Sequence, residues 1–300
     1  LMAGGFVQKF SFFSIFFSMF IFKNNKIRLL STSAIICILG AAIIFSGNRM
    51  PLLLFIIGLL LIFIFYRRLK IIIPVGLIGL AIIINFVFSS NATIKANYLS
   101  FYGQYTNTII NSFKIFSEDQ KENYDTQEKN NLSTENEKDE PIVDDFYSFW
   151  QKIEGIGSGH KMLFLTAIDT WKLNKIFGNG IKSFRYECKK FLIHVENRLC
   201  STHPHNYYLE ILTDVGIIGI IATLIIGILF VLFIIRNLKS IRENNIESSI
   251  LLVSTITMIL EVFPIKSTGS IFTTSNATYL VLIASILLSY NNLSIDKKFR

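Results

Sequence analysis

The segment STHPHNYYLEILTDVGIIG, residues 201–219, carries side chains that could move a proton. His205 has a ring that titrates near pH 6.5 when unperturbed, about the value that suits proton transfer at neutral pH. Asn206, Tyr207 and Glu210 follow it directly, and a long apolar run then begins. Titratable groups beside lipid are costly unless they have a use. The segment therefore predicts a functional site at the mouth of a membrane helix.

The composition of the chain indicates a membrane protein. Hydrophobic residues make up 51% of the sequence and charged residues only 17%, which is too apolar for a soluble domain of 300 residues. The net charge of +8 fits membrane orientation and contact with anionic lipid, and no soluble basic face for nucleic acid is evident. No signal peptide is visible after Leu1. Because LMAGGFVQKF resembles the outer end of a helix bundle, we expect an N-terminally incomplete chain.

Seven apolar stretches approach the roughly 20 residues that a helix needs to cross a bilayer. They are residues 10–22, 29–46, 50–65, 71–88, 215–235, 248–263 and 271–290. The first and third are short and need flanking residues to complete a span. We expect an all-α polytopic membrane protein, a bundle of about seven transmembrane helices with one large external loop that itself contains helices.

Basic residues in the short connections predict the orientation of these helices, because such residues stay on the cytoplasmic side. Every second connection is basic, with Lys23, Lys26 and Arg28, then Arg67, Arg68 and Lys70, then Arg236, Lys239 and Arg242, and finally Lys297, Lys298 and Arg300. The other short connections carry a single basic residue each, Arg49 and Lys266. The chain therefore divides into N-terminal helices in 1–88, an external loop in 89–206 and C-terminal helices in 207–300.

The external loop has three parts. Residues 117–145 are acidic and almost without apolar side chains, so we expect a disordered insertion. Apolar residues return at helical spacing in 146–175, which predicts a helix on or near the membrane. Residues 177–190 then supply a glycine turn followed by a cationic patch that is unusual for an outer face.

The spacing within residues 201–219 predicts one continuous helix. Pro204 suits the first turn, so we expect the helix to begin just before His205. At about 100° per residue, Gly216 and Gly219 then lie on the same stripe as the histidine. Glycines allow another helix to approach closely. We therefore expect a tight helix–helix contact at the two glycines, below a titratable ring at the membrane surface.

The external cysteines allow two interpretations. Cys188 and Cys200, with His194, His203 and His205 nearby, could hold zinc, but the usual paired ligand spacings are absent. Both cysteines lie on the outer side, where an oxidising compartment permits disulfides. We expect a disulfide between them, and neither a metal nor another cofactor.

The histidine segment resembles the O-antigen ligases and the related O-antigen polymerases, which are membrane glycosyltransferases. Their signature is His, an Asn-like residue, nine arbitrary residues, Gly, two more and a small residue or Tyr, and here it is His205, Asn206, Gly216 and Gly219. Further similar features are Arg49 with Leu53, and a glycine turn that leads to an aromatic residue, with Gly178, Gly180 and Phe184. The resemblance runs from about residue 29 to residue 290, and the long acidic insertion departs from it.

The resemblance implies a donor glycan on undecaprenyl diphosphate and an acceptor that is either a lipid A-core or a second glycan. His205 would be the general base on the acceptor hydroxyl, and Arg49 would hold the diphosphate, because guanidinium groups bind phosphate oxygens in pairs. Arg49 also runs against the orientation bias, although a solvated residue in a turn remains the alternative. Weaker candidates for contact with the substrate are Lys182, Arg185, Arg198, Asn206, Tyr207 and Glu210.

The resemblance places the protein in the bacterial inner membrane with its active site on the periplasmic side. Two other classes remain open. A transporter of lipid-linked glycans would also be polytopic, but it would more often show charges or broken helices at the midplane, which the sequence lacks. A non-catalytic scaffold would not need Arg49 or the His205 motif. Ligase and polymerase activities use the same donor, and the sequence does not separate them.

Overall fold

The computed structural model describes residues 3–100, 102–103, 158–192, 198–241, 245–264, 266–267 and 269–296. Throughout these residues the only regular secondary structure is helical. The expected acidic insertion, 117–145, lies outside the described residues, as does the first part of the helix expected in 146–175. Helices satisfy their own backbone hydrogen bonds, which is the condition for crossing lipid.

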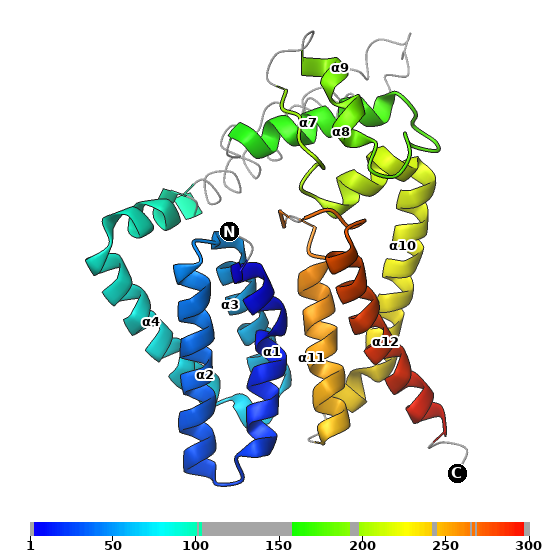
Figure 1. The fold of residues 1–300 in the computed structure, drawn as a ribbon. Coiled ribbons are helices and arrows are strands. Elements are labelled where there is room, and N and C mark those ends of the chain that lie inside the picture. Colours follow the sequence, from blue (N-terminus) through cyan, green and yellow to red (C-terminus); the bar gives the residue numbers. More distant parts are fainter. Residues whose placement is uncertain are drawn as a thin grey trace, which may run out of the picture.

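The helices form two groups that lie side by side (Figure 1). The first group contains α1 (Ala3–Ile21), α2 (Asn25–Phe45), α3 (Arg49–Phe65), the short 3₁₀ helix η1 (Arg67–Leu69) and α4 (Ile72–Ser90). The second contains α10 (Tyr207–Ile241), α11 (Ile246–Glu261) and α12 (Thr274–Asp296). Above them lie α7 (Ser158–Lys172), α8 (Phe184–Glu187) and α9 (Lys189–Leu192).

Each of the seven apolar stretches that the sequence predicted as spans overlaps one helix of the structure, apart from a few residues at the ends. Four of these helices, α1, α2, α4 and α10, are long and apolar enough to cross a membrane, and α3 and the apolar part of α12 are shorter. α11 is shorter still and ends in the buried acid Glu261. The structure thus gives four candidate spans by length and composition, and a total of seven stays a prediction.

Close packing of α1 against α3 and α11 joins the two groups. Phe12 of α1, Phe55 of α3 and Leu260 of α11 are buried in one hydrophobic cluster. A Cβ atom on Gly58 would lie 2.2 Å from the Phe12 ring and 2.9 Å from Leu260. The absence of a side chain at Gly58 therefore lets the three helices meet, as small residues do in membrane helix packing.

We predict that a membrane-impermeant thiol reagent will label a cysteine at Lys189 in intact cells, and one at Lys239 only after permeabilisation. Both side chains are exposed, and they belong to α9 and to the basic end of α10. Cys37 should be replaced in both variants, because it is the free cysteine among the described residues. Labelling in the reverse order would overturn the orientation deduced from the basic connections.

Candidate active site

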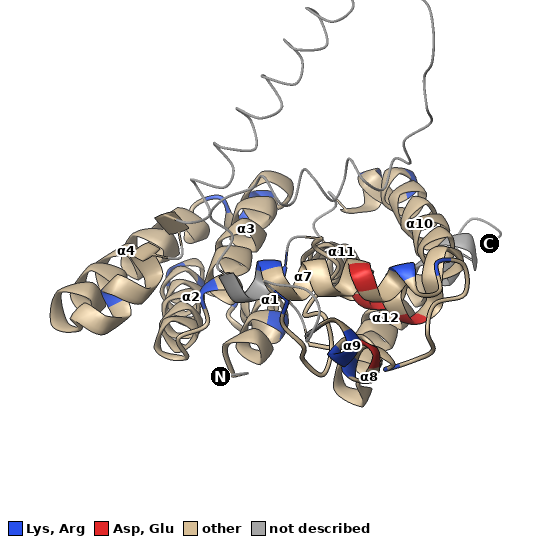
Figure 2. Ribbon diagram, turned by 90° about the horizontal axis from the view of Figure 1, so that it is seen from above, with Lys and Arg blue, Asp and Glu red and all other residues tan. Residues whose placement is uncertain are grey.

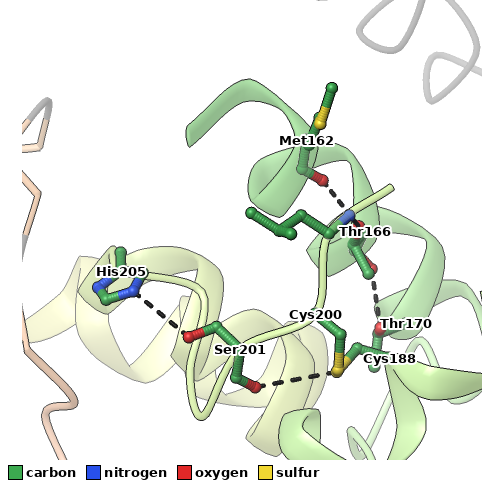
Figure 3. The surroundings of a disulfide bond; sticks show 8 residues. Met162, Thr166, Thr170, Cys188, Cys200, Ser201 and His205 are labelled. Carbon is green, nitrogen blue, oxygen red and sulfur yellow. Dashed lines mark hydrogen bonds between the residues drawn. A yellow bond between two sulfur atoms is a disulfide. The ribbon is translucent and has the colours of Figure 1, made fainter. Parts of the chain in front are cut away.

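The chain just before His205 is held by three contacts, two to α7 and one to Cys188 at the end of α8. The guanidinium Nε of Arg198 donates to Asp169 at 2.6 Å, and the backbone N–H of Leu199 donates to the Thr166 hydroxyl at 3.2 Å. Cys200 forms a disulfide with Cys188 whose Cα atoms are 5.4 Å apart, as expected from the sequence (Figure 3). These contacts fix the position from which the histidine segment begins.

His205 lies in a bend and not in a helix. Its φ angle is 60°, in the left-handed region that non-glycine residues seldom adopt. The Ser201 hydroxyl lies 3.4 Å from its Nε2 atom (Figure 3), and the His203 ring centroid lies 4.2 Å from its own. Strained backbone of this kind gathers at functional sites, where neighbouring contacts hold it. The half-buried ring is therefore held just before the N-terminal end of α10.

The expected helix start before His205 is wrong, because α10 begins at Tyr207. Asn206 caps this helix, since its Oδ1 accepts from the N–H groups of Tyr208 at 3.0 Å and Leu209 at 3.2 Å. Its Nδ2 donates to the Pro264 carbonyl at 2.7 Å. The amide thus ties α10 to the chain after α11, which is a structural role for a residue that we expected to contact substrate.

Tyr207 and Glu210 are also buried and joined to other parts of the protein. The Tyr207 hydroxyl donates to Glu261 Oε1 at 2.8 Å. Glu210 accepts from the backbone N–H of Ile271 at 2.8 Å, in the chain just before α12. Both side chains therefore position the outer ends of α11 and α12 around the histidine segment.

Glu261 stands at the centre of a buried ionic cluster that the sequence analysis did not predict. Its two carboxylate oxygens lie 2.9 Å from Lys9 Nζ and 2.7 Å from Lys266 Nζ. Lys9 also lies 4.5 Å from the centre of the Tyr279 ring. The cluster joins α1, α10, α11 and α12 directly below the histidine segment. Two signals in the sequence could have revealed it, namely an acid within an apolar stretch and a lysine on the outer side.

Gly216 marks a break in α10, with φ 72° and ψ −162°, a conformation that essentially only glycine adopts. The loop before α8 supplies the hydrogen bonds that the break removes. The N–H groups of Ile217 and Ile218 donate to Lys175 and Ile176, at 3.0 and 3.4 Å. In return, the carbonyls of Thr213 and Asp214 accept from Asn179 and Gly180, at 2.9 and 3.0 Å. The loop thus replaces the backbone hydrogen bonds of about one turn of α10.

Gly216 does allow a close approach, but its partner is the loop between α7 and α8 and not another helix. The expected helix–helix contact at Gly216 is therefore wrong. A Cβ atom at this position would lie 2.3 Å from the Ile176 carbonyl oxygen and 2.5 Å from the Gly178 nitrogen, both in the inserted loop. A Cβ atom on Gly219 would meet Val215 and Ile211 of the same helix, at 2.7 and 2.9 Å. Since His205 precedes the helix and Gly216 interrupts it, no continuous stripe joins the histidine to the glycines.

We predict that Gly216→Ala will lower the free energy of unfolding by about 2–3 kcal/mol and reduce the yield of folded protein. Alanine would adopt an unfavourable backbone conformation and collide with the backbone of the inserted loop. Gly227→Ala is the matched control, because Gly227 lies in the lower part of α10 and a Cβ atom there would meet nothing within 4 Å. Thermal unfolding in detergent compares the stability of the two variants. Equal midpoints for Gly216→Ala and Gly227→Ala would contradict the contact between Gly216 and the loop before α8.

Asp214 holds the chain that enters α8. Its carboxylate accepts from the backbone N–H of Lys182 at 2.5 Å and from the Ser183 hydroxyl at 3.1 Å. The Lys182 side chain is exposed, and its φ angle is 63°. Arg185 follows on α8, and within the described residues its buried Nε has no hydrogen-bond partner. A buried guanidinium nitrogen of this kind is suited to an anionic ligand.

Arg49 is the first residue of α3 and is half-buried. Burial raises the pKa of Tyr98 to about 12, the nearby Tyr102 adds to this rise, and the positive charge of Arg49 opposes it. Arg49 therefore lies near Tyr98, at the N-terminal end of α3. The next residue back, Asn48, has a buried Nδ2 without a hydrogen-bond partner among the described residues.

A comparison with protein-family models decides the family. The model described as O-antigen ligase matches residues 33–224, well over half of the chain. The chain belongs to the O-antigen ligase family. No curated protein and no solved structure matches it. The resemblance noted from the sequence is thereby confirmed.

Membership of the O-antigen ligase family makes the protein a bacterial multi-pass membrane protein and a glycosyltransferase-type enzyme with lipid-linked glycan substrates. The matched residues run from α2 to α10 and include Arg49, the loop that enters the break, and the segment from His205 to Gly219. Glu261 and Lys266 lie beyond residue 224, so the ionic cluster lies in part outside the matched region.

In this O-antigen ligase family member Cys188 and Cys200 are joined in a disulfide, so their thiols are not available as zinc ligands. His194, which was part of the alternative zinc site, lies outside the described residues. Arg198 is 4% exposed and paired with Asp169, which makes it a structural residue of the loop. Arg185 on α8 and Lys189 and Lys190 on α9 lie close together in the sequence, and the ribbon of these two short helices is partly blue when viewed from above (Figure 2).

Proposed function

We propose that this protein is an O-antigen ligase of the bacterial inner membrane. It transfers a glycan from undecaprenyl diphosphate to a lipid A-core acceptor on the periplasmic side. The observation that carries the proposal is the place of His205, within the family motif, at a strained bend on the outer end of α10. A ring held there by Ser201 and by the neighbouring His203 is suited to meet a hydroxyl group at the membrane surface.

In the proposed reaction, His205 accepts the proton of the acceptor hydroxyl as its oxygen attacks the anomeric carbon of the donor sugar. The bond between that carbon and the diphosphate oxygen breaks, and undecaprenyl diphosphate leaves with the bonding electrons. General base catalysis of this type contributes about 10²- to 10⁴-fold to a rate. The hydrogen bond to the Ser201 hydroxyl orients the ring for this step.

The diphosphate needs cationic donors, and the structure suggests two sets. Arg185 has a buried Nε without an acceptor among the described residues, and Lys182 lies three residues before it on the chain that Asp214 holds. Arg49 forms the second set with the Nδ2 of Asn48, which has no partner in the part of the chain that the structure describes. Phosphate oxygens would satisfy both buried donors, which is the expected fate of such groups in a bound complex. We assign the buried Asn206, Tyr207, Glu210 and Arg198 to positioning of the site.

A gene deletion tests the proposed activity. Surface glycolipids from the deletion strain should show a lipid A-core without attached glycan on a gel, and the wild-type gene should restore the attached glycan. A core that keeps a single repeat unit would indicate a polymerase, which joins lipid-linked repeats. An unchanged pattern of glycolipids would exclude both activities.

A further inference from the structure

The loop between α7 and α8 exposes apolar side chains next to the break in α10. Ile176, Phe177 and Ile181 are 57%, 70% and 66% exposed. This loop lies against the upper end of α10 at the edge of the molecule (Figure 1). Exposed groups of large apolar side chains mark surfaces that bind another protein or a membrane. Their place in the fold distinguishes between these two partners.

The break at Gly216 lies at the depth where the membrane-spanning part of α10 begins. From Ile217 to Ile235 the helix is apolar, and Arg236 follows at its basic end. At 1.5 Å per residue this stretch is roughly 28 Å long. The hydrocarbon core of a bilayer is about 30 Å thick. The apolar stretch therefore fills the membrane by itself, and the break lies at the outer boundary of the hydrocarbon.

The exposed loop residues continue the lipid-facing surface of α10. Ile217 and Ile218 are exposed, and their N–H groups bond directly to Lys175 and Ile176 of the loop. These hydrogen bonds also satisfy part of the loop's backbone, a condition for placing non-helical chain at the edge of lipid. Ile176 and Phe177 therefore lie level with the first lipid-facing residues of α10.

We propose that residues 173–181 form an interfacial anchor that inserts into the outer leaflet of the membrane. Ile176, Phe177 and Ile181 enter the boundary between headgroups and acyl chains. The exposed side chain of Lys175 reaches back to the phosphate groups of anionic lipids, as basic side chains do at membrane surfaces. The anchor fixes the depth of the loop that enters the break of α10, and it depends on no particular enzymatic activity.

Spin labels test the depth of this loop in the full chain. Cysteines at Phe177, Ile181 and, as controls, Ile225 and Lys189 are labelled with a nitroxide in a Cys37→Ala background. The protein is reconstituted in nanodiscs of phosphatidylethanolamine and phosphatidylglycerol. Ile225 is a lipid-facing residue of α10, and Lys189 is an exposed residue of α9. Oxygen concentrates in lipid, whereas a nickel chelate stays in water. The ratio of the nitroxide's collision rates with oxygen and with the chelate therefore reports the depth of the label in the membrane.

Labels at Phe177 and Ile181 should favour oxygen, as the label at Ile225 does, and the label at Lys189 should favour the nickel chelate. Lys175→Glu should shift the Phe177 label toward the nickel chelate, because the new charge is repelled by phosphatidylglycerol. If the loop binds a protein partner instead, the Phe177 label should be exposed to water in the absence of that partner. Addition of the partner should then shield the label from both reagents. A Phe177 label as accessible to the chelate as the Lys189 label would overturn the anchor.

Discussion

His205→Ala should lower the turnover of glycan transfer by about 10²- to 10⁴-fold while leaving donor binding largely unchanged. The expected loss follows from removal of the group that accepts the proton of the attacking hydroxyl. The ring is half-buried and makes contacts with Ser201 and His203, and its loss opens no cavity in the hydrophobic core. The folded yield should therefore stay near that of the parent. The measurement is transfer from a synthetic lipid-diphosphate glycan by purified protein.

His203→Ala is the matched control for this experiment. The two rings lie in the same bend with centroids 4.2 Å apart, so both variants lose the same ring contact. Only His205→Ala also loses the proposed base, and we expect the His203 variant to stay within about tenfold of the parent rate. Equal losses in the two variants would indicate that the bend, and not the ring of His205, is what the reaction needs. A parent-like rate for His205→Ala would leave the cationic residues alone to carry the chemistry.

The positions of the long helices could be predicted from the sequence because apolar length is what a membrane helix requires. Each of the seven expected stretches overlaps one helix, and every second short connection lies at a cluster of Lys and Arg. The ends of the helices were harder to predict from the sequence. α1 begins at Ala3, earlier than the apolar run suggests, because packing against neighbouring helices extends a helix beyond its most hydrophobic part.

The interior of the candidate site could not be predicted because it depends on contacts between segments distant in the chain. Periodicity placed His205 on the stripe of Gly216, and that inference fails wherever a helix is interrupted. The interruption at Gly216 is stable only because residues 175–180 supply alternative hydrogen bonds, and no local pattern announces that partner. The Cys188–Cys200 disulfide could be expected because the basic connections of the sequence predict that both cysteines lie on the outer side, where disulfides can form.

The same limit explains why the ionic cluster around Glu261 was missed. Lys9 and Glu261 belong to helices at opposite ends of the chain, and each one alone looks like an isolated charge near a membrane surface. The outer lysine, Lys266, violates the orientation bias in the same way as Arg49. An unexpected charge on the outer side can thus reflect an internal ion pair as well as a ligand.

Glu261→Gln should lower the free energy of unfolding by about 3–5 kcal/mol, the range typical when one partner of a buried ion pair is removed. The carboxylate lies between two lysines, and its loss leaves both ammonium groups buried without a counter-charge. Tyr207, which donates to the same carboxylate, would lose its charged acceptor as well. Because Tyr207 lies two residues after His205, the variant that remains folded should also bind donor less well.

The pH dependence of this variant separates a buried charge from a simple packing defect. Burial lowers the pKa of Lys266, and the charge of Glu261 opposes that effect. Without the carboxylate the pKa should fall further, so the folded state binds fewer protons than the unfolded state in the range between the two pKa values. Stability then rises with pH in that range. The midpoint of thermal unfolding should therefore recover toward the parent value in alkaline buffer, and it should stay low if the defect is only steric.

Glu187→Gln provides the matched control for Glu261→Gln. Glu187 also pairs with a lysine, Lys190, but that lysine is exposed on α9, and exposed pairs contribute about 0–1 kcal/mol. The double variant Glu261→Gln with Lys266→Met should be more stable than Glu261→Gln alone, because it removes one of the two uncompensated cations. If Glu261→Gln lowers the free energy of unfolding as little as Glu187→Gln does, the cluster would be accessible to water. Its link between α1 and α11 would then contribute little to stability.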